Sequence, residues 1–201
     1  MKTDIIAVSG RRKMMEAALE QADKVAAYKG LTGKNALHLR LLTEEMMGMM
    51  RSITGEPDGL FWIEEEGGAY ELHLQIRKLL SADQKEQLIS ASSSGKNESA
   101  KGLMGRLREF FDWSGDEDIA AYTGPLMMPD MYEHSSTPTL DLEWSMTRYE
   151  HALQNLVDQG DHAAKEAWDE LEKSVVKNVA DDVKVSIRNG ITEMVILKKM
   201  A

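Results

Sequence analysis

The chain has 201 residues, a formal net charge of −10 and no cysteine. Its length suits one domain with a hydrophobic core, and the lack of cysteine excludes disulfides, thiolate metal sites and cysteine nucleophiles. The negative charge makes nucleic acid and anionic lipid unfavourable partners. Since no run of 18 apolar residues is present, we expect no membrane span. The short, polar first segment favours a cytoplasmic protein without a signal peptide.

The first part of the sequence predicts a strand followed by two helices. Residues 4–8 suit a short strand, and 11–29 repeats apolar residues at helical spacing up to Gly30, a residue suited to end a helix. Residues 36–53 carry the strongest helical pattern, with Asn35 as the predicted N-cap. Its apolar stripe recurs every three or four residues and comprises Leu39, Leu42, Met46, Met49 and Ile53, widened by Leu41 and Met50.

Glu45 lies at the edge of this apolar stripe, three residues after Leu42. One interpretation is that Glu45 marks the boundary of the solvated face of a core helix. The other is that its carboxylate points into a pocket. The helical pattern by itself leaves both interpretations open.

The next segment predicts a hairpin, with strands at 60–66 and 69–77 joined by Gly67-Gly68. The second strand alternates apolar and polar residues, which is typical of a sheet with one covered face. Its apolar positions are Tyr70, Leu72, Leu74 and Ile76. Because His73 falls on the polar side, we expect a solvated histidine and not a ligand.

The rest of the chain predicts a helix at 101–113, an irregular segment at 114–140, helices at 147–158 and 162–179, and a closing hairpin. Strands 183–188 and 191–197 form that hairpin about Asn189-Gly190. Residues 122–144 are apolar for a loop, so they either pack on the core or cover a groove or partner surface. Seven residues carry this interpretation: Tyr122, Leu126, Met127, Met128, Met131, Tyr132 and Trp144.

Together these elements predict an α+β protein built as a two-layer α/β sandwich. A mixed, mostly antiparallel sheet should carry both hairpins. Helices at 11–29, 36–53 and 162–179 should cover one face of that sheet, because each carries an apolar stripe that needs a partner.

Three stretches resemble the GHKL ATPase family, nearest to the branch that contains small bacterial anti-sigma factors with serine-kinase activity. Residues 41–49, Leu-Leu-Thr-Glu-Glu-Met-Met-Gly-Met, resemble the N-box helix of that branch. Residues 61–77 resemble the hairpin after the N-box, and 171–183 resemble the last helix and the start of the closing hairpin. The resemblance covers about half of the chain. It implies a single domain over 1–201 with the histidine-kinase-like ATPase fold and an insertion at 114–160.

The resemblance also implies roles for residues of the N-box. In the family, the N-box Glu polarises the attacking hydroxyl or water, and an Asn four residues later holds the magnesium that bridges the nucleotide phosphates. Glu45 matches the Glu and is the implied catalytic residue. Met49, next to Gly48, stands at the Asn position, and a thioether is a poor ligand for a hard cation.

Two further features bear on a nucleotide site. Gly102 and Gly105 resemble the glycine-rich helix start that meets phosphates in the family, although close helix packing explains them equally. The Asp-x-Gly-x-Gly box that reads adenine has no counterpart after Ile76. We therefore expect no cofactor and no metal, and the family's ATP with magnesium is the alternative.

The resemblance to the family, together with the missing magnesium-binding and adenine-binding residues, favours a non-catalytic or weakly nucleotide-binding regulatory module that acts by binding a protein. The implied partner is a sigma factor or an anti-sigma antagonist, and a homodimer stays open. One alternative is an active ATP-dependent protein serine kinase or ATPase, and the other is an unrelated α+β domain.

Overall fold

The structure is a computed structural model that describes residues 1–9, 12–54, 58–77, 142–188 and 191–200. The predicted helix at 101–113, the irregular segment at 114–140 and the Asn189-Gly190 turn lie outside these residues. The same holds for Gly102 and Gly105.

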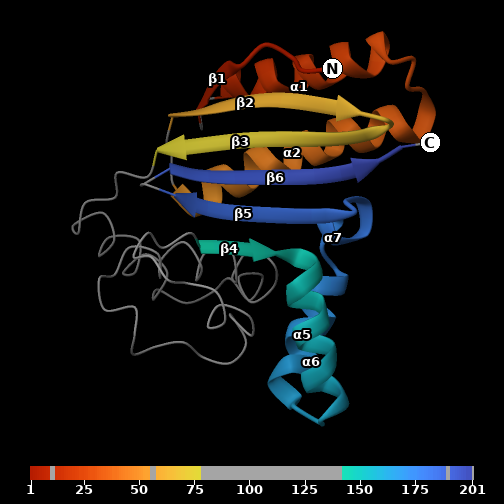
Figure 1. Cartoon of the computed structure of the whole chain (residues 1–201), viewed down its shortest axis with the longest axis vertical. Helices are drawn as coiled ribbons and strands as arrows, with labels where there is room; N and C mark the ends of the chain where they lie inside the picture. Colours follow the sequence, from red (N-terminus) through yellow and green to blue (C-terminus); the bar gives the residue numbers. More distant parts are fainter. Residues whose placement is uncertain (10–11, 55–57, 78–141, 189–190, 201) are drawn as a thin grey trace.

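The described residues form an α+β fold around one six-stranded sheet (Figure 1). The strands are β1 (Ile6–Ser9), β2 (Asp58–Glu66), β3 (Ala69–Arg77), β4 (Leu142–Ser145), β5 (Asp182–Arg188) and β6 (Ile191–Lys199), in the order β1-β2-β3-β6-β5-β4. The predicted placement of both hairpins in one sheet is confirmed, because β3 pairs with β6. Every pairing among the described strands is antiparallel, so the parallel component of the predicted mixed sheet is not found among them.

The β2–β3 hairpin forms as its sequence predicts. Gly67 and Gly68 have φ angles of 59° and 85°, which suit the tight turn that matches the twist of the two strands. The alternation in β3 is also confirmed, since Tyr70, Leu72, Leu74 and Ile76 are all buried.

Two helices, α1 (Arg12–Tyr28) and α2 (Gly33–Thr54), cover one face of the sheet (Figure 1). Gly30 ends α1 as predicted, with φ at 66°, and the Leu31 N–H donates to the Ala26 carbonyl in a Schellman motif. The start of α2 was predicted wrongly. The helix begins at Gly33, so Asn35 lies in its first turn and is not the N-cap.

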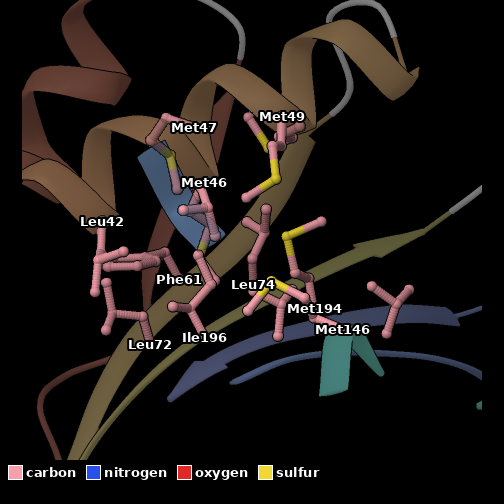
Figure 2. Packing of buried hydrophobic residues seen from close by; sticks show 14 of the residues in the cluster. Leu42, Met46, Met47, Met49, Phe61, Leu72, Leu74, Met146, Met194 and Ile196 are labelled. Atoms are coloured by element: carbon pink, nitrogen blue, oxygen red, sulfur yellow. The ribbon is translucent and has the colours of Figure 1, made fainter. Parts of the chain in front are cut away.

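The hydrophobic core lies between α2 and the sheet (Figure 2). On α2 the predicted residues Leu39, Leu42, Met46, Met49 and Met50 are buried, whereas Leu41 is only partly buried. The arc also includes Thr43 and Met47, because α1 and the sheet both pack on this helix. The buried residues of α2 are Leu39, Leu42, Thr43, Met46, Met47, Met49 and Met50. From the sheet, Phe61, Ile63, Leu72, Leu74, Met194 and Ile196 complete this layer.

The predicted helix at 162–179 is broken into α6 (His162–Glu172) and α7 (Val175–Val179). The break arises because the Ser174 side chain caps α7 at the Lys177 N–H, while the Asn178 side chain donates to the carbonyl groups of Glu172 and Ser174. As a result α6 packs mainly on α5 (Met146–Asp158), and the two form a helical hairpin that extends away from the sheet (Figure 1). The prediction that this whole segment covers the sheet is therefore wrong, whereas α7 does pack on α2.

Strand β4 was not predicted, and it forms the edge of the sheet beside β5. Trp144 on this strand is 6% exposed and its ring lies 6.0 Å from that of Tyr149. Of the seven apolar residues singled out in 122–144, Trp144 lies among the described residues, and it belongs to the core. None of the described helices combines the length and apolar character needed to span a membrane.

Candidate functional site

Glu45, Gly48 and Met49 lie close together on α2, because residues three and four apart are neighbours on a helix, but they differ in burial. Met49 is 3% exposed and belongs to the core, whereas Gly48 is exposed and Glu45 is partly buried. The three residues therefore meet different surroundings, which are the core at Met49, solvent at Gly48 and the boundary between them at Glu45. Figure 2 shows Met49 pointing from α2 toward the sheet, in the same cluster as Leu74 and Met194.

The surroundings of Met49 do not fit the magnesium that the resemblance implies. Magnesium takes oxygen ligands in octahedral geometry, and Met49 offers a thioether among apolar neighbours. Among the described residues, no three His, Cys, Asp or Glu side chains form a group that could hold a metal ion. We therefore derive no step through a metal at this position.

Gly48 occupies an exposed helical position where the added methyl of alanine meets no described heavy atom within 4 Å. Gly48→Ala should stabilise the fold by roughly 0.5–1 kcal/mol, because glycine in a helix interior costs about this much relative to alanine. Urea denaturation of the two proteins measures the difference. A loss of stability would show that another part of the protein approaches the helix at this point.

Glu45 is the one N-box residue whose chemistry is altered by its environment. Burial raises the pKa of its carboxyl above the ordinary value of 4.5, and the neighbouring Glu44 raises it further. A carboxyl with a raised pKa releases its proton less readily and accepts one more readily. This is a property of general bases, although it also occurs at the edge of any helix packed on a core.

The raised pKa of Glu45 predicts a pH-dependent effect of Glu45→Gln. The Glu45 carboxyl has a higher pKa in the folded chain than in the unfolded chain. Below its pKa in the unfolded chain the carboxyl is protonated in both states and has no effect on stability. As the pH rises through its pKa in the folded chain, ionisation of the partly buried carboxyl lowers the free energy of unfolding. The substitution should therefore stabilise the protein near neutral pH and change little near about pH 4. Urea midpoints across this range test the prediction, with Glu44→Gln expected to give a smaller gain. An equal effect at both pH values would contradict it.

Sequence reasoning missed Thr192, a buried polar residue of β6. Thr192 is 2% exposed, faces the helix-covered side between Ile76 of β3 and Ile187 of β5, and its hydroxyl has no hydrogen-bond partner among the described residues. Thr192 stands at the same alternating positions of β6 as the apolar residues Met194 and Ile196. This position in the sequence could have predicted that the threonine is buried.

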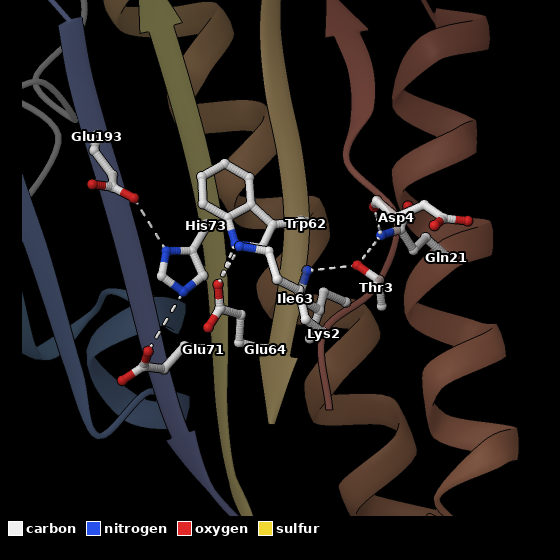
Figure 3. A network of polar contacts seen from close by, with 10 residues as sticks. All are labelled: Lys2, Thr3, Asp4, Gln21, Trp62, Ile63, Glu64, Glu71, His73 and Glu193. Carbon is white, nitrogen blue, oxygen red and sulfur yellow. Dashed lines mark hydrogen bonds and ion pairs between the residues drawn. The ribbon is translucent and has the colours of Figure 1, made fainter. Parts of the chain in front are cut away.

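The opposite face of the sheet holds a cluster around Trp62 and His73 (Figure 3). The two rings stack with centroids 4.8 Å apart and planes 5° apart. His73 Nδ1 lies 3.2 Å from Glu193 and its Nε2 lies 3.5 Å from Glu71. With 12% of its side chain exposed, His73 is not the solvated histidine that the alternation predicted, because the indole and two carboxylates enclose it.

Glu64 completes this cluster. Its carboxylate accepts a 2.8 Å hydrogen bond from the indole N–H of Trp62 and pairs with Lys2 at 2.8 Å. The Lys2 ammonium also lies 5.0 Å from the centroid of the Trp62 ring, which is a cation–π contact. These contacts, led by Lys2, lower the pKa of Glu64. Glu64 therefore stays ionised at neutral pH beside the aromatic pair.

Comparison of the chain with models of protein families, with curated proteins and with solved structures finds no match.

Proposed function

We propose that this chain is a non-catalytic regulatory module of the cytoplasm that acts by binding another protein. The proposal includes a GHKL-like fold near the anti-sigma factor branch, as residues 41–49 imply. The observation that carries it is the burial of Met49, at 3% exposure in the core, at the position where the resemblance implies a magnesium-holding Asn. A side chain enclosed by Leu74, Met194 and their neighbours supplies no oxygen to a metal-bridged phosphate.

A surface for a protein partner is supported by the second face of the sheet. Helices α1 and α2 lie on one side, and none of the described elements covers the side of Trp62 and His73 (Figure 1). Two-layer domains bury one sheet face, and a second face that combines apolar and charged side chains is suited to a partner. A sigma factor or an anti-sigma antagonist is the partner that the resemblance implies, and a second copy of the chain is the alternative.

The binding proposal is tested with the products of the genes that flank this one. Each purified product is titrated into the full chain in a calorimeter without nucleotide, and light scattering of the chain alone measures self-association. Saturable one-to-one heat with a neighbour, or a stable dimer, is the expected result. A monomer that remains inert toward every neighbour, and that hydrolyses ATP, would overturn the proposal.

Glu45 favours a second candidate function, an ATP-dependent protein serine kinase or ATPase. Its raised pKa and partial burial suit a base that polarises a hydroxyl or water. Phosphate release from ATP with magnesium distinguishes the two functions. This second function requires turnover by the unaltered chain that Glu45→Gln abolishes, whereas our proposal expects no release above the background without protein.

A further inference from the structure

The sheet face around Trp62 and His73, which no element among the described residues covers, has a pattern of side chains that the strand register gives directly. Trp62 of β2 pairs with His73 of β3, which pairs with Val195 of β6, which pairs with Lys184 of β5. Glu64, Glu71 and Leu197 form the row on one side. On the other side, the row comprises Leu60, Gln75, Glu193 and Ser186. Leu60, Val195 and Leu197 therefore form an apolar strip that runs diagonally across the face, past Trp62 and His73. Glu64 and Glu71 lie on one side of this diagonal, and Glu193 lies on the other.

The apolar strip is partly open to solvent. Leu60 is 44% exposed, and Val195 and Leu197 are partly buried. Trp62, by contrast, is 6% exposed because His73 and Lys2 lie against it. A partner that lies on this face would remove from solvent the apolar area of Leu60, Val195 and Leu197 that is exposed in the structure.

Lys2 shows which chemistry this face accepts. Its ammonium lies over the Trp62 ring and pairs with Glu64, its β-bridge partner on β2, so one lysine of the chain already uses the indole and a carboxylate together (Figure 3). Such a pair of contacts is a recognised way to bind a cation, because the ring face and the carboxylate both carry negative charge toward it.

Glu71 and Glu193 offer further acceptors of the same kind. Their side chains are 47% and 32% exposed, and each lies beside the His73 ring. With Glu64, the cluster holds three carboxylates against one lysine, which leaves two negative charges when His73 is neutral. Lys184 lies beyond Val195 on the same face and Asp182 lies beside Leu197, so acidic residues still outnumber lysines among the described positions of these rows. The chain as a whole carries a charge of −10.

We propose that the uncovered face around Trp62 and His73 docks an amphipathic helix of a partner protein whose apolar side is bordered by lysines or arginines. The apolar side covers Leu60, Val195 and Leu197, and the cations pair with Glu71 and Glu193. A helix is the occupant because it packs on a sheet face through one apolar stripe, as α2 does on the opposite face. This inference rests on the proposed function, since it names the partner chemistry of a protein-binding module.

The test uses the full chain and a fluorescein-labelled synthetic helix with a leucine face bordered by lysines. Fluorescence anisotropy measures its dissociation constant for the unaltered chain and for the double variant Glu71→Gln with Glu193→Gln. The matched control is Glu166→Gln with Asp169→Asn, which removes the same charge from exposed positions of α6. Circular dichroism confirms that both variants are folded.

We expect the face variant to bind the lysine peptide about tenfold more weakly or worse, and the α6 variant to stay within about twofold of the unaltered chain. A peptide with glutamates in place of the lysines should not bind. If both variants bound the peptide equally more weakly, the peptide would be attracted by the overall negative charge and not by this face, and the inference would be wrong. A peptide that does not bind the unaltered chain would also overturn the inference. If the peptide experiment fails, the assignment of this face as the docking surface is wrong. The proposed function is tested separately, by titration with the neighbouring gene products and with nucleotide, and neither measurement depends on this face.

Discussion

Replacing Phe61 by alanine should lower the free energy of unfolding by about 3–5 kcal/mol, the range found when a buried aromatic residue is truncated. Phe61 is fully buried and is the largest of the side chains that the core encloses completely. It pairs with Leu74 on β3 and points toward α2 (Figure 2). Because tightly packed cores relax only partly around a deletion, a cavity term adds to the lost burial. Urea denaturation measures the difference.

The neighbouring Leu60→Ala is the matched control for Phe61→Ala. Leu60 lies on the same strand but faces the uncovered side and is 44% exposed. Its truncation should cost under about 1 kcal/mol, because less apolar area is lost from the folded state. Equal losses for the two variants would contradict the register of β2, since a shift by one residue exchanges the two faces.

Replacing Met49 by asparagine should destabilise the protein by about 3 kcal/mol or more. The substitution removes a buried side chain, which contributes about 1.5–3 kcal/mol, and places an amide where it finds no polar partner, which costs about 1–3 kcal/mol more. It should also fail to create ATP binding, although it restores the Asn of the family's N-box, because the adenine-reading Asp is still missing after Ile76.

Met49→Leu separates the two causes of this loss. Leucine conserves the volume and apolar character of methionine, so its cost should stay below about 1.5 kcal/mol. If Met49→Asn proved nearly neutral, the side chain at this position would reach solvent. Position 49 would then be free to face a nucleotide, and the interpretation of Met49 as a core residue would be wrong.

The elements that could be predicted from the sequence are those in which the turn or cap residues and the spacing of apolar residues indicate the same structure. The β2–β3 hairpin combined a Gly-Gly turn with a strict alternation around Leu72 and Leu74, and α1 ended at Gly30 as expected. The stripe of α2 was also predictable, because a helix between a sheet and a second helix needs a wide apolar arc. Each of these signals lies within the element that it predicts.

The features that were missed depend on particular side-chain contacts that apolar spacing does not reveal. The break between α6 and α7 is set by the caps of Ser174 and Asn178, which interrupt an apolar spacing that otherwise continues. Burial of His73 requires Trp62 on the neighbouring strand and Glu193 from a strand 120 residues further along. Alternation assigns a residue to a face of the sheet but does not say what covers that face.

The most direct test of the central claim is a calorimetric titration of the full chain with ATP and magnesium. The burial of Met49 and the missing adenine contact each remove one set of interactions, and charge-assisted contacts contribute about 1.5–3 kcal/mol each. We predict no saturable heat at physiological nucleotide concentration and no release of phosphate. A dissociation constant below about 100 μM would contradict the account and would assign the chain to the nucleotide-binding members of the family that it resembles.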